Sequence, residues 1–117
     1  RNTYAEALFR VEDDHFETDV LIESNRHCIG TLEVLLHELV AQPGDEPLKL
    51  NLDTLSQLDK RAIRRLYAES GVDMVVLDML SLAPLTTLPR LLKRMREQEE
   101  KWTKERKALE SVTSMLY

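Results

Sequence analysis

Residues 3–41 read TYAEALFRVEDDHFETDVLIESNRHCIGTLEVLLHELVA, and this stretch decides the fold. It contains no proline and a single glycine, Gly30. One set of side chains recurs at alternating steps of three and four, the spacing of one helix face. The set is Leu8, Val11, His15, Thr18, Ile22, Asn25, Ile29, Leu32, Leu36 and Leu39. Pro43 and Gly44 end the pattern. We therefore predict a helix from about Thr3 to about Ala41.

Such a helix is too long for a compact domain. At 1.5 Å per residue it spans roughly 58 Å, whereas a compact chain of this size has a diameter of only about 35 Å. The helix must therefore either break, with Gly30 as the expected position, or project from the core. If it projects, Phe9, Phe16 and Val20 in its N-terminal half need another surface to cover them, which predicts a binding partner.

The rest of the chain predicts three more helices and no β-sheet. Residues 42–56 are expected to form a loop, and a helix over about 57–70 follows, stopped by Gly71. The very apolar stretch 72–82 is compatible with a buried helix or with a strand. We favour the helix because no second strand is available to pair with it.

The last helix is expected to begin near Thr86 or Thr87, after Pro84 has ended the preceding element. It tolerates Pro89 in its first turn and runs to about Met115. The predicted fold is thus all-α: a long N-terminal helix packs with two shorter helices and a long C-terminal helix in a single domain, 1–117.

Composition supports this fold and limits the compartment. The chain is 43% apolar and 32% charged, with 3 Gly and 4 Pro, which is typical of a charged helical protein. No apolar run approaches the roughly 18 residues of a membrane span, and the start has no signal-peptide pattern. The lone Cys28 cannot form an internal disulfide. We expect a piece of a longer protein from the cytosol or nucleus.

Charge divides the chain in two. Residues 1–59 hold 4 Lys and Arg against 13 Asp and Glu, a net charge of −9, and residues 60–117 hold 12 against 8, a net charge of +4. An acidic first half and a basic second half can complement each other internally. They can equally present surfaces of opposite sign to two partners.

Motifs for catalysis or metal binding are not found in the sequence. His15, His27, Cys28 and His37 occur without a CxxC or HExxH arrangement, and adjacent His27 and Cys28 point about 100° apart on a helix. The serines lack a GxSxG context, and Cys28 on an apolar helix face is expected to be a small core residue. We therefore expect no enzyme activity, no metal and no cofactor.

The charged clusters have two interpretations each. An acidic run surrounds Phe16 and Val20 and comprises Glu12, Asp13, Asp14, Glu17, Asp19 and Glu23. This run is either a binding surface for a basic partner or an ordinary solvated helix face. The two basic clusters are Lys60, Arg61, Arg64 and Arg65, and Arg90, Lys93, Arg94 and Arg96. They either bind an inositol phosphate or an acidic protein surface, or pair with the acidic residues of the same chain. Overall acidity and the lack of interleaved aromatic residues argue against direct nucleic-acid binding.

Trp102 is the only tryptophan, and it is the only apolar residue between Arg96 and Lys107. It is either the last core contact of the final helix or an interface anchor, since tryptophan is enriched at binding hot spots. The surrounding tail is too polar to be expected to pack along its whole length.

Several ordered blocks stand out, namely 2–10 (NTYAEALFR), 11–17 (VEDDHFE), 22–25 (IESN), 61–67 (RAIRRLY), 92–95 (LKRM) and Trp102. Together they resemble the histone-deacetylase-interacting domain of the Sin-three (switch-independent three) transcriptional corepressor family. The likeness extends to about Val112. Departures from the family pattern at 14–16, at 59–60 and around Trp102 mark a divergent member.

The resemblance implies a nuclear scaffold for transcriptional repression and chromatin regulation. Such domains hold a class I histone deacetylase and accessory subunits of the corepressor complex, and the chemistry belongs to the partner. The first helix and the last helix would then present two binding surfaces. The implied protein-binding residues are Phe9, Glu12, Asp13, Phe16, Glu17, Asp19, Glu23, Arg61, Arg65, Tyr67, Pro84, Pro89, Lys93, Arg94 and Trp102.

A rival interpretation is a self-associating helical module. The heptad spacing of the first helix favours a coiled-coil dimer. The polar residues His15, Thr18 and Asn25 lie on the same helix face and weaken the coiled-coil interpretation.

Overall fold

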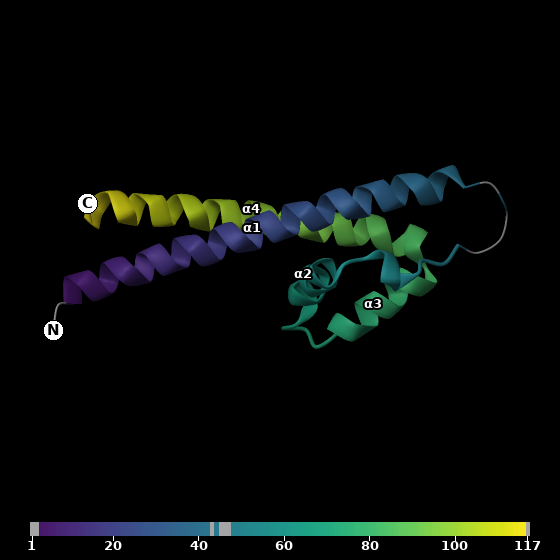
Figure 1. Ribbon diagram of the computed structural model, residues 1–117, viewed down its shortest axis with the longest axis horizontal. Helices are drawn as coiled ribbons and strands as arrows, with labels where there is room; N and C mark the ends of the chain where they lie inside the picture. Colours follow the sequence, from purple (N-terminus) through teal and green to yellow (C-terminus); the bar gives the residue numbers. More distant parts are fainter. Residues whose placement is uncertain (1–2, 43, 45–47, 117) are drawn as a thin grey trace.

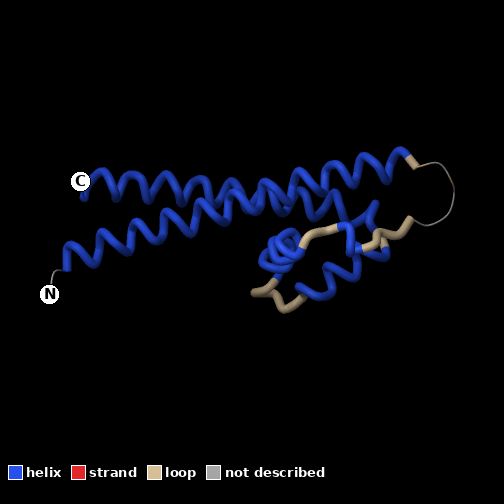
Figure 2. The backbone as a smooth tube through the Cα atoms, in the orientation of Figure 1, coloured by secondary structure: helices blue, strands red, loops and turns tan. Residues whose placement is uncertain are grey.

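The computed structural model describes residues 3–42, 44 and 48–116. Its elements are α1 (Thr3–Ala41), a short 3₁₀ helix η1 (Leu52–Thr54), α2 (Gln57–Tyr67), α3 (Asp73–Leu82) and α4 (Pro84–Leu116). Figures 1 and 2 show helices and connecting loops, with no strand among the described residues. The all-α prediction, with two long helices flanking two short ones, is confirmed.

The long helix does not break. α1 continues through Gly30, whose backbone has no positive φ and which is exposed, so nothing there interrupts the hydrogen-bonded ladder. The molecule measures 66 × 25 × 20 Å with a Cα radius of gyration of 18.2 Å, well above the roughly 13 Å of a compact domain. α1 and α4 lie antiparallel along this axis, and α2 and α3 cover one side near the C-terminal half of α1 (Figure 1).

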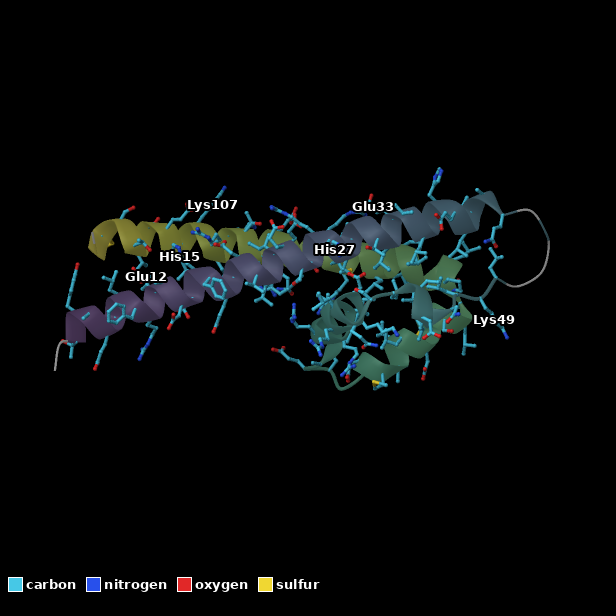
Figure 3. All side chains as sticks on the ribbon, in the orientation of Figure 1. Glu12, His15, His27, Glu33, Lys49 and Lys107 are labelled. Carbon is cyan, nitrogen blue, oxygen red and sulfur yellow. The ribbon has the colours of Figure 1, made fainter. Side chains whose placement is uncertain are left out.

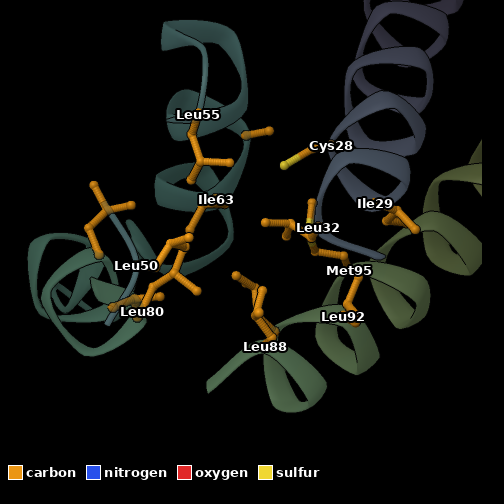
Figure 4. Packing of buried hydrophobic residues seen from close by; sticks show 14 of the residues in the cluster. Cys28, Ile29, Leu32, Leu50, Leu55, Ile63, Leu80, Leu88, Leu92 and Met95 are labelled. Atoms are coloured by element: carbon orange, nitrogen blue, oxygen red, sulfur yellow. The ribbon is translucent and has the colours of Figure 1, made fainter. Parts of the chain in front are cut away.

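The hydrophobic core lies where all four helices meet (Figure 4). α1 contributes Cys28 and Leu32, α2 contributes Ile63, α3 contributes Leu80 and α4 contributes Met95, and each of these side chains is completely buried. Burying a side chain such as leucine or isoleucine stabilises a fold by roughly 1.5–3 kcal/mol. The core therefore anchors one end of the α1–α4 pair, and the N-terminal half of α1 extends beyond it.

Two element boundaries differ from the prediction. α2 ends at Tyr67 rather than near Ser70, and Gly71, with φ +71°, follows as the expected left-handed residue. The expected loop over 42–56 contains η1, where the Asn51 side chain accepts a hydrogen bond from the Asp53 amide at 2.9 Å. Pro43 and Pro47 of that loop lie outside the described residues.

The predicted start of the last helix was wrong. α4 begins at Pro84, where a proline costs little because the first helical N–H groups have no intrahelical acceptor. Thr87 is buried and donates a hydrogen bond from Oγ1 to the Met79 carbonyl at 3.1 Å, so it ties α4 to α3 instead of capping a helix. Pro89 consequently lies in the second turn of α4, not in its first.

Candidate protein-interaction surfaces

The heptad stripe of α1 packs against α4 of the same chain. The Asn25 side chain donates a hydrogen bond to the Met95 carbonyl at 2.9 Å, and a hydrogen bond of 3.1 Å joins His15 Nε2 and Thr113 Oγ1. Thr18 donates to the Asp14 carbonyl within its own helix at 2.8 Å. All three polar members of the stripe are therefore satisfied within the chain. A dimer through this stripe would have to displace α4.

The opposite side of the N-terminal half of α1 is open. Phe9, Phe16 and Val20 are 61%, 70% and 49% exposed, and their spacing of seven and four residues places them on one helix face. Glu12 and Asp13 are exposed one turn before Phe16. We call Phe9, Glu12, Asp13, Phe16 and Val20 the aromatic–acidic face. Figure 3 shows Glu12 and His15 on this projecting half of α1, with Lys107 on the α4 segment beside it.

The other acidic residues of the run have different surroundings. Arg106 Nε lies 2.7 Å from a carboxylate oxygen of Asp19, which ties Asp19 to α4. Glu23 forms a long 3.8 Å ion pair with Arg26 within α1. Glu17 lines a groove of about 420 Å³ between α1 and α4. The acidic run is therefore divided among the open face, the α4 contact, the groove and, for Glu23, an ion pair within α1.

Internal pairing accounts for only part of the opposite charges. Cross-helix ion pairs join Arg26 to Glu99 at 3.3 Å and Arg96 to Glu33 at 3.5 Å. The α2 cations are Lys60, Arg61, Arg64 and Arg65, and none of them forms an ion pair within the described residues. Arg65 donates a hydrogen bond of 3.5 Å to the Ser24 hydroxyl. The α2 cations therefore remain available to an acidic partner.

A second surface lies between α2 and α4. The guanidinium of Arg94 stands 6.0 Å from the ring centroid of Tyr67. Burial raises the pKa of Tyr67, and the nearby Arg94 charge opposes that shift. A pocket of about 280 Å³ beside them is lined by Arg65, Arg94 and Trp102 among others. Trp102 is half-buried there, between the two roles expected from the sequence.

The remaining predicted binding residues are not brought together with this pocket. Arg61 is exposed on α2, and Pro89 and Lys93 are exposed on α4. Pro84 is fully buried at the start of α4, so a partner cannot reach its ring in this structure.

One open surface was missed by sequence reasoning. The stretch 72–82 was expected to be a buried helix, yet only Val76, Leu77 and Leu80 of α3 are buried. Met74 and Leu82 are 59% and 63% exposed on the outer side. The available signal was that α3 carries apolar side chains on more than one side, whereas the core covers one of its faces.

The one thiol, Cys28, lies inside the core. Cys28 is completely buried, and its Sγ donates a 3.6 Å hydrogen bond to the Asp59 carbonyl. Burial, followed by the nearby Asp59 charge, raises the pKa of the Cys28 thiol to about 12. Among the described residues, no cluster of three or more His, Cys, Asp or Glu side chains suits a metal ion. A search of the same residues finds no helix with the length and apolarity of a membrane span.

Comparison with known proteins identifies the family. A model described as Sin3 family co-repressor matches residues 1–46. Over 121 aligned residues that cover its whole length, the present chain is 35% identical to Paired amphipathic helix protein Sin3-like 1 of Arabidopsis thaliana. It is 35% identical to Paired amphipathic helix protein Sin3b of Mus musculus, and 32% identical to Transcriptional regulatory protein SIN3 of Saccharomyces cerevisiae, each over 87% of the chain.

The fold and its open faces define an all-α module built on an antiparallel pair of long helices. The chain belongs to the Sin3 co-repressor family, and the resemblance of the sequence blocks to this family is confirmed. It spans 8%, 10% and 7% of the lengths of the Arabidopsis, mouse and yeast relatives named above.

Proposed function

We propose that this chain is a scaffold segment of a nuclear transcriptional corepressor, which recruits a class I histone deacetylase and accessory subunits of a chromatin-modifying complex. Membership of the Sin3 co-repressor family supports this role, and one relative is named a transcriptional regulatory protein. In this proposal the chain itself is not an enzyme, uses no cofactor and does not bind nucleic acid directly. The deacetylase supplies the chemistry.

The observation that carries the proposal is the aromatic–acidic face. Phe9 and Phe16 are 61% and 70% exposed on a helix that extends beyond its own core. Burying an exposed phenylalanine against a partner contributes roughly 1.5–3 kcal/mol. The flanking carboxylates of Glu12 and Asp13 would speed encounter with a basic surface and would select against acidic ones. The face therefore suits a partner whose contact surface is basic with apolar pockets.

The surface between α2 and α4 is the proposed site for a second subunit. It presents Arg65 and Arg94, with the half-buried Tyr67 and Trp102 between the two helices. Arginine and aromatic residues dominate binding hot spots because they combine large contact area with directed polar groups. An acidic accessory subunit would match this surface.

The test is capture of deacetylase from nuclear extract on the immobilised chain, followed by an activity assay with and without a deacetylase inhibitor. Inhibitor-sensitive activity is expected on the wild-type chain. Replacing Glu12, Asp13 and Glu17 together by lysine should reduce it at least about tenfold, which corresponds to about 1.4 kcal/mol. Helicity should be unchanged, because all three side chains are exposed.

A matched control separates the face from general surface effects. Val40 is 68% exposed at the far end of α1, so Val40→Glu should capture as much activity as the wild type, while Phe16→Glu should not. Equal capture by the triple lysine variant and the wild type would remove the assignment of this face. A folded wild-type chain that captures no deacetylase would remove the recruitment proposal for this segment.

A further inference from the structure

The outer side of α3 is a mostly apolar surface that the fold leaves uncovered, with the exposed carboxylate of Asp78 between Met74 and Leu82 on the side away from α4. Val75, Met79 and Leu82 are 52%, 48% and 63% exposed, and their spacing of four and three residues places them in one row along the helix. Met74, 59% exposed, lies beside this row. We call Met74, Val75, Met79 and Leu82 the α3 outer face. Two of its four members are methionines, which adapt their shape to a bound surface.

This exposure is concentrated rather than scattered. Of the fifteen large apolar side chains that are exposed in the described part of the chain, six lie between residues 72 and 85. Single exposed apolar residues are normal on proteins, whereas a contiguous group marks an interaction site. The inner side of α3 already supplies the buried residues that hold it to the core. The outer face adds nothing to the fold that would explain its apolar character.

A pocket adjoins the row at Met79. It has a volume of about 160 Å³ and lies between α3 and α4, with Tyr67, Val76, Thr86 and Leu91 in its lining. A cavity of about 150 Å³ accepts a benzene ring, so the pocket has room for one large apolar side chain. The ridge of α3 and this pocket together form a surface into which an amphipathic helix can place one anchor residue.

The α4 side of this surface is basic. Arg90 lines the pocket and is exposed, and Lys93 and Arg94 are exposed three and four positions later, one turn further along α4. None of these three cations has a carboxylate partner among the described residues. Arg94 lies over the Tyr67 ring that also borders the pocket. A helix bound along α3 would therefore have a row of positive charge along one flank.

We propose that the α3 outer face and the adjoining pocket bind an acidic amphipathic helix of a partner protein. Its apolar stripe would cover Val75, Met79 and Leu82, one large side chain would fill the pocket, and carboxylates on one flank would meet Arg90 and Arg94. Such charge complementarity favours a different protein over a second copy, because a second copy of this face would bring another basic row and no row of carboxylates to meet Arg90 and Arg94. The proposal does not rest on deacetylase recruitment, since it uses none of the aromatic–acidic face.

The experiment uses the 117-residue chain and a designed, fluorescein-labelled helical peptide with leucines at i, i+3, i+4 and i+7 and glutamates along one flank. Fluorescence anisotropy gives its dissociation constant. The control peptide carries lysine at every glutamate position. The glutamate peptide is expected to bind at least about tenfold more tightly than the lysine peptide, because both bury the same apolar stripe and differ only in charge.

Variants locate the binding site. Met79→Glu should weaken the glutamate peptide at least about tenfold, and Arg90→Glu with Arg94→Glu should reverse the preference so that the lysine peptide binds better. Val112→Glu, at a position 42% exposed elsewhere on α4, should bind the glutamate peptide like the wild type. Circular dichroism confirms that each variant is folded, and Met79→Glu should still capture deacetylase.

Three results would overturn the proposal. Equal affinity for the two peptides would show that the basic row does not select an acidic helix. Absence of binding, or binding that Met79→Glu leaves intact, would exclude this face as the site. A dimer seen by sedimentation in the wild type and lost in Leu82→Glu would assign the face to a second copy of the chain.

Discussion

The side-chain amide of Asn25 donates a hydrogen bond of 2.9 Å to the backbone carbonyl of Met95, seventy residues away in the sequence. Asn25 is 1% exposed, so this bond is made inside the α1–α4 contact, and α1 and α4 share more contacts than any other pair of elements. A buried asparagine between helices can fix their register, because any shift leaves its amide without a partner. The bond therefore specifies how the two long helices align.

Asn25→Leu is expected to lower the free energy of unfolding by about 1–3 kcal/mol, since the bond is lost and a larger apolar group must fit the same space. Urea denaturation followed by circular dichroism measures the change. Ser24→Ala is the control, because Ser24 donates to carbonyls of its own helix and accepts only a long, 3.5 Å hydrogen bond from another helix, donated by Arg65. An Asn25→Leu variant as stable as the wild type would show that the amide bond does not hold the register.

Asp19 and Arg106 form the ion pair that ties the projecting end of α1 to α4, with 2.7 Å between Nε and the carboxylate oxygen. Their side chains are 53% and 26% exposed, so either single charge reversal should cost no more than about 1 kcal/mol. The double exchange, Asp19→Arg with Arg106→Asp, should recover part of that loss. Thermal denaturation of the four proteins forms a double-mutant cycle, and a coupling energy of zero would contradict the pairing.

The same contact distinguishes Asp19 from its acidic neighbours. Because Asp19 faces α4, Asp19→Asn is expected to lower stability slightly and to leave deacetylase capture near the wild-type level. Asp13→Lys, on the aromatic–acidic face, should reduce capture and leave stability within about 0.5 kcal/mol. Parallel assays of capture and of thermal unfolding on both variants measure the contrast. Loss of capture in Asp19→Asn alone would reverse the assignment.

The helices could be predicted because periodicity and proline positions are local properties of the sequence. The spacing from Leu8 to Leu39 and the left-handed Gly71 define elements without any knowledge of their neighbours. Boundaries set by tertiary contacts could not be predicted in this way. Thr87 has the residue type of an N-cap, but its hydroxyl bonds to Met79 of the preceding helix. That acceptor becomes visible only once α3 and α4 are packed.

Which face of a helix is covered also depends on long-range packing. The polar tail of α4 was not expected to pack along its length, yet Arg106 and Thr113 reach Asp19 and His15 of α1. Polar contacts of this kind produce no hydrophobic periodicity, so they cannot be predicted from the sequence pattern. The exposure of Phe9 and Phe16 was expected only if the long helix projected from the core, and the sequence left open whether it projected or broke near Gly30. The exposure of the α3 outer face could not be foreseen, because α3 has apolar side chains on more than one side and its sequence does not say which side the core covers.

The buried thiol of Cys28 provides a chemical test of the core. Its pKa is raised to about 12 by burial and by the nearby Asp59 charge, from an ordinary value of 9.0. At pH 8 the thiolate fraction of the folded chain is therefore roughly 1,000-fold below that of an ordinary cysteine, and only thiolate reacts with Ellman's reagent. We expect the native chain to react very slowly and the urea-unfolded chain to react at the ordinary rate. Fast native labelling would contradict the packing around Cys28.

The same pKa gives a pH dependence of stability. Below about pH 9 the thiol is protonated in both folded and unfolded states and contributes no dependence. Between about pH 9 and about pH 12 the unfolded thiol ionises while the folded thiol keeps its proton, so stability falls as pH rises. Cys28→Ala should reduce this slope in urea titrations at several pH values. An unchanged slope in the variant would assign the alkaline loss to other groups.

Ser56 caps the helix that presents the α2 cations. Its hydroxyl accepts a hydrogen bond from the Asp59 amide at 3.1 Å, which satisfies one of the N–H groups that have no acceptor within α2. Ser56→Ala should therefore lower the free energy of unfolding by about 1 kcal/mol, whereas Ser56→Asp should keep the cap. Urea denaturation measures both, with the exposed Ser70→Ala as the control. Because α2 carries Arg61 and Arg65, the alanine variant should also weaken binding at the surface between α2 and α4 when assayed near its unfolding midpoint. Equal stability of the alanine and wild-type chains would mean that tertiary contacts of α2, rather than its cap, define where the helix begins.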